Sequence, residues 1–208
     1  MINSMAFVSG IGALLSNPYT FIYGVVKAYG YFAVLVLMIM EGSTLPIPSE
    51  VVLPIAGLFA AKGALNIYIT IIVATLGSAI GFAIDYYIGY YLGKDVVYKH
   101  LSLFHIHKAE LDKFDLWFEK NGAFAVFFTR MVPVLRTLIN FPAGFARMQK
   151  KKFFLYSISA ALVWNIVLTL FGYYLLAAKS AEIVLAGIGL FAIVLYLIYR
   201  YATSKMKR

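Results

Sequence analysis

Two carboxylates lie close together in an otherwise apolar part of the chain. Glu41 and Glu50 bound a short segment that also contains Pro46 and Pro48. Because each proline lacks a backbone N–H and clashes with the preceding turn, this segment is predicted to break the chain between two short apolar helices. Carboxylates in surroundings of low dielectric constant tend to take up protons, so Glu41 and Glu50 are candidates for proton coupling.

A second break carries two arginines in place of the two acids. Arg130 and Arg136 enclose Pro133, and Pro142 follows in the next apolar run. A guanidinium group can make two parallel hydrogen bonds to a phosphate and stays charged when it loses its water. We therefore predict that Arg130 and Arg136 bind an anionic head group, and that the prolines break a second helical hairpin.

The composition identifies the surroundings of these charges as a membrane. Of the 208 residues, 62% are hydrophobic and 13% are charged, whereas a soluble domain carries about 25% charged residues. The net charge of +9 comes from residues that lie mainly between the apolar runs, which is the distribution that membrane topology produces. We therefore expect one integral membrane domain over residues 1–208, with membrane lipids and not nucleic acid as the partner.

The apolar runs follow the same order twice. In each unit, a short run, a break and a second short run precede a run that is long enough to cross a bilayer. The first repeat covers residues 28–93 and the second covers residues 122–178. Paired interrupted segments of this kind are typical of transporters built from inverted repeats. Each pair of short runs is predicted to form a re-entrant hairpin.

Three further segments complete the predicted fold. Residues 94–121 alternate apolar and charged residues, which suits an amphipathic helix at the cytoplasmic interface, and residues 183–199 are expected to cross the membrane. Residues 1–26 suit either a spanning helix or a helix lying on the surface. The predicted fold class is therefore an all-α polytopic membrane protein, with two oppositely oriented re-entrant hairpins, about three to four spanning helices and an interfacial helix.

The positive-inside rule orients these elements. Lysine and arginine are concentrated in residues 94–121, in residues 147–152 and at the C-terminus, which are therefore assigned to the cytoplasm of a cell-membrane protein. The two hairpins then enter from opposite sides and meet near the middle of the bilayer. Four unpaired charges there would cost on the order of 10 kcal/mol, so the acids and arginines are expected to lie close together around a water-accessible pocket. A structural salt bridge that locks the hairpins together remains the alternative to such a site.

A glycine face on residues 65–93 carries one more acid. Gly77, Gly81, Gly89 and Gly93 recur at four-residue steps, and Asp85 occupies the step that is skipped. Small residues at this spacing allow neighbouring helices to approach closely. Asp85 is included among the proton-coupling candidates, although a role in helix packing fits its position equally well.

Other polar residues are assigned structural roles. Asn165, next to Trp164, is interpreted as an interhelical hydrogen-bonding residue, and His105 and His107 as residues of a solvated loop without a third metal ligand. The chain has no cysteine and no Gly-rich phosphate loop before a predicted helix. We therefore expect neither a metal nor a cofactor.

Three motifs together resemble the DedA family, the prokaryotic branch of the SNARE-associated or VTT-domain superfamily. They are the run from Glu41 to Glu50, the glycines from Gly77 to Gly93 with Tyr86 among them, and the run from Phe128 to Thr137 with the following Ala143-Gly144 and Met148. The resemblance covers about residues 28–178. The chain departs from the usual pattern at Phe82, where an Asp is frequent, and at Tyr90, where an Arg is common.

The resemblance implies a function in moving lipids across the bilayer. It makes Glu41 and Glu50 the membrane acids and Arg130 and Arg136 the essential arginines, with proton dependence and two opposed hairpins. We therefore expect a flippase or scramblase, not an enzyme, that moves a phosphate-bearing lipid such as a polyprenyl phosphate or a phospholipid. Two alternatives to a transporter remain: a scaffold for other membrane proteins, and an enzyme acting on lipid phosphate.

Overall fold

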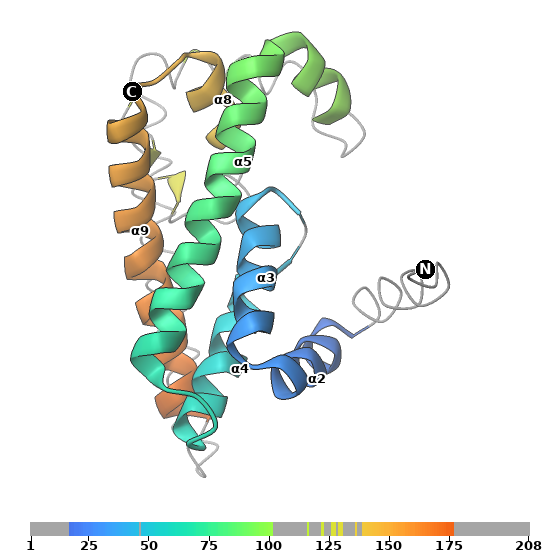
Figure 1. Cartoon of the computed structure of the whole chain (residues 1–208), viewed down its shortest axis with the longest axis vertical. Coiled ribbons are helices and arrows are strands. Elements are labelled where there is room, and N and C mark those ends of the chain that lie inside the picture. The colour runs from blue at the N-terminus through green and yellow to red at the C-terminus, as the bar shows by residue number, and fades with distance from the viewer. Residues whose placement is uncertain are drawn as a thin grey trace.

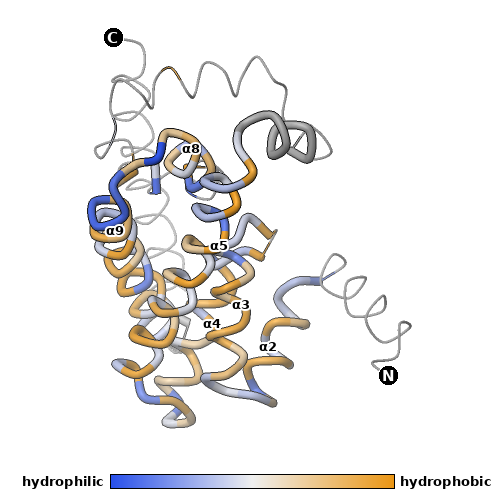
Figure 2. The backbone as a smooth tube through the Cα atoms, turned by 45° about the horizontal axis from the view of Figure 1, so that its top comes forward, coloured by the Kyte–Doolittle hydropathy of each residue, from blue (hydrophilic) through white to orange (hydrophobic). Residues whose placement is uncertain are grey.

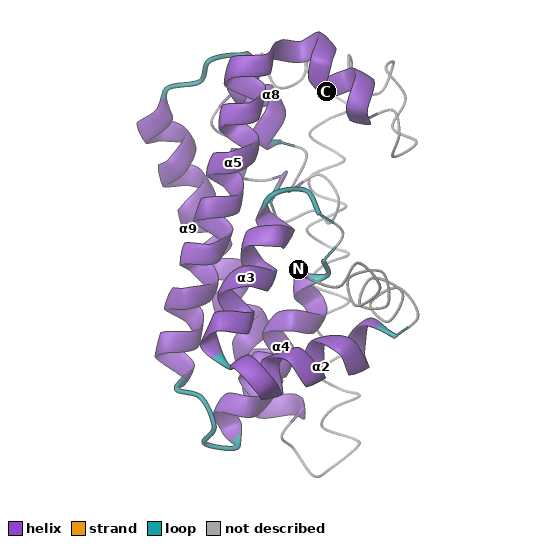
Figure 3. Ribbon diagram, turned by 45° about the vertical axis from the view of Figure 1, so that its right-hand side comes forward, coloured by secondary structure: helices purple, strands orange, loops and turns teal. Residues whose placement is uncertain are grey.

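The computed structural model describes residues 17–45, 47–101, 116, 122, 126–127, 129–130, 136 and 139–176. All regular secondary structure in this part of the chain is helical, as the sequence predicts, and no strand occurs in it (Figure 3). The predictions for residues 1–16, for the amphipathic helix after residue 101, for His105 and His107, for the final helix at 183–199, and for Pro46 and Pro133 lie outside the described residues.

The described chain begins with a short capped helix. In α2 (Pro18–Tyr29), the side chain of Asn17 accepts a hydrogen bond from the backbone N–H of Thr20 at 3.1 Å, and Pro18 occupies the first turn. Both residues suit a helix start, because the cap satisfies a free N–H and proline has none to leave free. Gly30, with φ of 54°, then turns the chain into the next helix.

The first break is narrower than the sequence suggested. Helix α3 (Tyr31–Gly42) continues through Glu41, and helix α4 (Ser49–Ala61) already includes Glu50 in its first turn. The break is thus confined to residues 43–48, and both acids lie on helix ends. Pro48 directly precedes α4, where a missing N–H costs nothing, and an acid in the first turn is stabilised by the helix dipole. The two helices run side by side in opposite directions (Figure 1).

Two long helices support the short ones. In α5 (Ile67–Leu101), the residues Ile67–Gly93 are long and apolar enough to cross a membrane, and so are Lys150–Tyr174, which form α9 (Lys150–Phe171) and the start of the π-helix η2 (Gly172–Leu176). These two candidate spans match the crossings predicted from about residue 65 and residue 153. Gly93 leaves the helical conformation, with φ of 75°, and marks the end of the first span.

The short helices α3 (Tyr31–Gly42) and α8 (Asn140–Phe145) are both held against α5 by its glycine face. A side chain at Gly77 or Gly81 would collide with the backbone of α3, and one at Gly89 would collide with the backbone of α8 (Asn140–Phe145). The predicted close approach is therefore confirmed at these three glycines. Helix α3 docks on the first half of the α5 span and α8 on the second half, and α8 lies at the opposite end of the molecule from α2 (Figure 1).

Helix α4 makes the corresponding close contact with α9 and η2. A Cβ atom added to Gly57 would lie 2.1 Å from the Thr169 carbonyl oxygen, and one added to Gly172 would lie 2.0 Å from the Pro54 carbonyl oxygen. Likewise, Gly89 of α5 faces Gly144 of α8. In each case, the short helix after a break packs through glycine on the long helix of the other unit.

Pro142 does not interrupt a helix, although we predicted that it breaks the second hairpin. It is the third residue of α8, and the first turn of a helix tolerates a residue without an N–H.

The outer surfaces of the long helices expose apolar residues, whereas the start of α9 is strongly hydrophilic (Figure 2).

Candidate functional site

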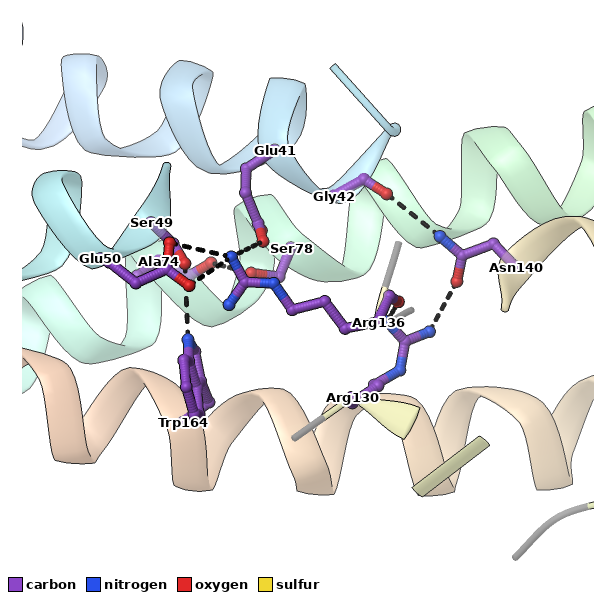
Figure 4. A network of polar contacts seen from close by, with 10 residues as sticks. All are labelled: Glu41, Gly42, Ser49, Glu50, Ala74, Ser78, Arg130, Arg136, Asn140 and Trp164. Carbon is purple, nitrogen blue, oxygen red and sulfur yellow. Dashed lines mark hydrogen bonds and ion pairs between the residues drawn. The ribbon is translucent and has the colours of Figure 1, made fainter. Parts of the chain in front are cut away.

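Arg136 contacts both acids of the first break. Its Nη2 atom lies 3.0 Å from Oε1 of Glu41 and 3.1 Å from Oε1 of Glu50, so one nitrogen is shared between two carboxylates. Figure 4 shows the arginine side chain between α3, which carries Glu41, and α4, which carries Glu50. The predicted meeting of acids and arginine is confirmed for these three residues.

The three charged groups differ in their contact with the surroundings. The side chains of Glu41 and Arg136 are only 7% and 11% exposed, whereas that of Glu50 is 34% exposed. Of the two terminal nitrogens of Arg136, Nη1 is buried and has no hydrogen-bond partner among the described residues. The guanidinium group that neutralises the two carboxylates therefore still has an N–H donor available for another ligand.

Arg130 is occupied by neutral acceptors. Its Nη2 donates to Asn140 Oδ1 at 2.6 Å and to Ser157 Oγ at 2.8 Å, and its Nη1 donates to the Arg136 carbonyl oxygen at 3.1 Å. The guanidinium group also stacks on Phe82, 3.5 Å from the ring centre. Arg130 is fully buried, so these contacts replace the water that it loses. It joins the second break to α5, α8 and α9.

Asn140 connects the two breaks. While its oxygen accepts from Arg130, its Nδ2 atom donates to the Gly42 carbonyl oxygen at 3.2 Å and approaches Oδ2 of Asp85 at 3.4 Å. The same Asp85 oxygen accepts a hydrogen bond from the Thr44 hydroxyl, at the tip of the first break. Asn140 and Asp85 thus form a polar bridge from α8 through α5 to the end of α3.

The position of Asp85 supports both interpretations left open by the sequence. It lies between Gly81, which meets α3, and Gly89, which meets α8, so it is part of the packing face. Its side chain is also buried, and it accepts hydrogen bonds from Thr44, just after α3, and from Asn140, the first residue of α8. Thr44 has a φ of 59°, which is unusual for a β-branched residue, and its bond to Asp85 holds it in this conformation.

Trp164 of α9 closes the side of the site opposite Glu41. Its Nε1 donates to Ser49 Oγ at 3.4 Å, and the guanidinium of Arg136 lies 5.3 Å from its ring centre (Figure 4). The neighbouring Asn165 donates to Thr75 at 3.2 Å, which confirms the interhelical hydrogen bond predicted for that residue. Trp164, by contrast, belongs to the charged site.

A small cavity lies beside the arginines. Its volume is about 20 Å³, which is room for about one water molecule. Its lining comes from all parts of the site: Glu41, Ser78, Phe82, Arg130, Arg136, Ala161, Trp164 and Asn165. In this conformation a phosphate group does not fit, so the site is closed around its own ion pairs.

Several residues of the site escaped the sequence interpretation. Asn140 and Ser157 hold Arg130, and Ser49 holds Trp164. For Asn140 a signal was present, because it lies four residues after Arg136 in an otherwise apolar run. No group of three or more metal-ligating side chains occurs among the described residues.

Comparison with known proteins assigns the chain to a family. The model of the VTT domain matches residues 47–174. Undecaprenyl phosphate transporter A of Staphylococcus aureus is 33% identical over 177 residues, which are 83% of this chain and 86% of the relative. An alkaline phosphatase-like protein of Lactococcus lactis is 32% identical over 153 residues, 71% of this chain and 72% of the relative.

A third relative carries the family name itself. Protein DedA of Escherichia coli is 34% identical over 67 residues, 32% of this chain and 31% of that protein. No solved structure matches the chain. The matched VTT domain contains Glu50, Asp85 and both arginines of the site, and the apolar helices agree with a membrane location. The chain is therefore a membrane protein of the DedA family that carries a VTT domain.

Proposed function

We propose that this protein moves a phosphate-bearing lipid, such as a polyprenyl phosphate or a phospholipid, across the bilayer. The observation that carries the proposal is the arrangement around Arg136. Its guanidinium is shared between Glu41 and Glu50 and keeps a buried N–H group for which the described part of the chain supplies no acceptor. The relative from Staphylococcus aureus, whose name specifies an undecaprenyl phosphate transporter, supports the same class of substrate.

The geometry supports two re-entrant hairpins that enter from opposite sides. The first consists of α3, the break at 43–48 and α4. Thr44, in this break, donates a hydrogen bond to Asp85 in the middle of α5. The second ends in α8, which packs on the other half of α5. The reciprocal glycine contacts of α4 with η2 and of α8 with α5 are those expected of an inverted repeat.

In the proposed mechanism, the lipid phosphate competes with the carboxylates for Arg136. The phosphate first engages Nη1, and Glu50, which is one-third exposed, then gives up its place on Nη2. Glu41, which is enclosed, stays next to the arginine. When Glu50 returns, it displaces the phosphate on the other side of the barrier. The acyl chains remain in the bilayer while the head group crosses the thin region between the hairpins.

Proton coupling is part of the same proposal. A carboxylate that leaves a cation in a low-dielectric site is stabilised by taking up a proton. Glu50, Glu41 and Asp85 are the groups assigned to this step, since the two glutamates contact Arg136 and Asp85 contacts Asn140 in the bridge between the breaks. The protein is assigned to the cell membrane with its C-terminus in the cytoplasm, as the distribution of positive charge favours.

Hydrolysis of a lipid phosphate is the second candidate, because the relative from Lactococcus lactis is named alkaline phosphatase-like. Three hydroxyl groups of the site have structural partners: Thr44 donates to Asp85, Ser49 accepts from Trp164, and Ser157 accepts from Arg130. Release of inorganic phosphate distinguishes the two functions. A scaffold without transport would give neither phosphate release nor lipid movement.

Reconstitution in liposomes tests the proposal. The full chain is incorporated with labelled polyprenyl phosphate or phospholipid, with and without a pH gradient, and head-group accessibility on the two leaflets is followed. Transport is expected to be faster than in protein-free liposomes and to stop in an Arg136→Gln variant. No movement of any of these lipids would overturn the proposal, whereas movement that ignores the gradient would remove only the proton coupling.

A further inference from the structure

A second group of cations gathers far from Arg136, where α8 turns into α9. The guanidinium of Arg147 lies 5.3 Å from the centre of the Tyr90 ring, and Nζ of Lys150 lies 5.6 Å from the same centre. Lys150 also lies 5.1 Å from the ring centre of Tyr87. Two positive side chains therefore converge on one aromatic ring of α5.

The turn that carries these cations is held firmly in place. Arg147 has a φ of 47°, and its backbone N–H donates to the Gly144 carbonyl oxygen at 3.0 Å. The hydroxyl of the buried Tyr86 donates to the Met148 carbonyl oxygen at 2.6 Å. Tyr86 in turn stacks on Tyr90, with ring centres 6.1 Å apart. The two cations are thus positioned by the packing of α5 against the turn.

These cations have no acidic partner among the described residues. Among the residues that the structure describes, the ion pairs join Arg136 to Glu41 and Glu50, at the central site. Arg147 and Lys150 are exposed, and Lys151 and Lys152 extend the positive surface along the start of α9; Figure 2 shows this stretch as hydrophilic. Aromatic rings attract cations only modestly at exposed sites, so an anion would relieve the repulsion between them.

The neighbouring surface of α5 is apolar. Ile84, Ile88 and Leu92 are four residues apart, so they share one helix face, and they are 41%, 37% and 53% exposed. Tyr91, one residue before Leu92, is more exposed still and stacks on Tyr87. A ligand that contacts both surfaces needs an anionic end for the cations and an apolar end for α5.

We propose that Arg147 and Lys150, mounted around Tyr90, bind the phosphate of an anionic membrane lipid whose acyl chains lie along the exposed face of α5. This site is separate from Arg136 and does not depend on transport. It holds a lipid of the bilayer at the mouth of the second hairpin, since α8 directly precedes the turn. A basic surface of this kind attracts anionic lipid because the charges lie within a Debye length of the membrane.

Binding of dioctanoyl phosphatidic acid to the full chain in an uncharged detergent tests this site. The wild type is expected to bind it, and the double variant Arg147→Gln/Lys150→Gln is expected to bind about thirty-fold more weakly, as loss of about two surface charges predicts. The variant Lys27→Gln/Lys62→Gln removes two exposed lysines elsewhere and is expected to bind as the wild type does. The charge-preserving exchange Arg147→Lys/Lys150→Arg is expected to retain binding and guards against a folding defect.

Three results would overturn the proposal. The first is equal affinity of the wild type and the Arg147→Gln/Lys150→Gln variant. The second is equal affinity for inorganic phosphate and for the lipid, which would show that the apolar face takes no part. The third is loss of binding in Arg136→Gln together with its retention in the surface variant, which would place the lipid at the central site. Dioctanoyl phosphatidylcholine, which is zwitterionic and has no net charge, serves as the reference and is expected to bind weakly.

Discussion

The amide oxygen of Asn140 lies 2.6 Å from Nη2 of Arg130 and fixes the orientation of that guanidinium group. The two arginines of the second break therefore have different environments. Arg130 is surrounded by neutral acceptors and by the Phe82 ring, whereas Arg136 faces the two carboxylates. Each arginine keeps one buried nitrogen without a partner among the described residues, Nε in Arg130 and Nη1 in Arg136, and only that of Arg136 belongs to a group paired with acids. We therefore assign a chiefly structural role to Arg130, and the exchange between carboxylates and lipid phosphate to Arg136.

Replacing Asn140 with leucine is expected to lower the free energy of unfolding by about 3 kcal/mol. The change removes the shortest of the three hydrogen bonds of the buried Arg130 guanidinium and the side-chain donor to the Gly42 carbonyl, and a buried polar group that loses a partner costs about 1–3 kcal/mol, more when it is charged. Thermal unfolding of the purified protein in detergent measures the loss.

Asn165 provides the matched control for Asn140. It is also a buried asparagine, but its side-chain amide has one described partner, Thr75, at 3.2 Å. Asn165→Leu is therefore expected to cost about 1 kcal/mol, the usual contribution of one neutral hydrogen bond. Equal losses for the two variants would contradict the bridging role of Asn140.

Arg136→Lys is expected to abolish lipid transport even though it keeps the charge. A single ammonium can still approach Glu41 or Glu50, but it cannot present a second, fixed N–H to an incoming phosphate. Transport is measured in liposomes, and the unfolding temperature is measured in parallel to separate function from folding. A variant that folds and transports at the wild-type rate would show that charge alone is sufficient.

The two ion pairs of Arg136 are expected to differ in strength. Glu41 is almost enclosed, so its pair with Arg136 is weakly screened, whereas Glu50 is one-third exposed. Double-mutant cycles with Arg136→Gln, Glu41→Gln and Glu50→Gln should give a coupling of about 2 kcal/mol for Glu41 and below about 1 kcal/mol for Glu50. The reverse order would contradict the exchange role proposed for Glu50.

The sequence was sufficient to predict much of the charged core of the site. Charged residues beside prolines, in a chain that has to satisfy every buried charge, predicted that Glu41 and Glu50 would meet Arg130 and Arg136. In the structure Arg136 pairs with both acids, whereas the hydrogen bonds of Arg130 go to neutral acceptors. The four-residue glycine spacing predicted the close approach at Gly77, Gly81 and Gly89. Both predictions combine helix or turn geometry with an energetic requirement. A charge in the membrane has to be paired, and neighbouring helices have to pack without gaps.

Other features required the tertiary structure. The helix limits at Glu41 and Glu50 depend on Pro48 at the start of α4, and the sequence did not indicate on which side of each acid the break begins. Asn140 and Trp164 contribute through partners that are distant in the chain, Gly42 and Ser49. A single polar residue in an apolar run does not specify its partner, since that depends on how the helices pack.

The contact of α4 with η2 gives a prediction that rests on backbone geometry alone. A methyl group at Gly57 would lie 2.1 Å from the Thr169 carbonyl oxygen, and one at Gly172 would lie 2.0 Å from that of Pro54. The clashing atoms belong to the backbone, so no side-chain rotation can relieve them. Gly57→Ala and Gly172→Ala are each expected to lower the free energy of unfolding by about 3 kcal/mol, at the upper end for overpacking.

Gly24 of α2 provides the opposite case within the same chain. Apart from its chain neighbours and the backbone of α2 itself, no atom of the described residues lies within 4 Å of a Cβ added there, so Gly24→Ala should stabilise the helix by up to about 1 kcal/mol through its better helix propensity. Thermal unfolding of the three variants separates the two effects. If Gly57→Ala and Gly172→Ala unfold at the same temperature as Gly24→Ala, the short helix after the first break does not pack on the long helix of the second unit, and the reciprocal arrangement that supports the inverted repeat is lost.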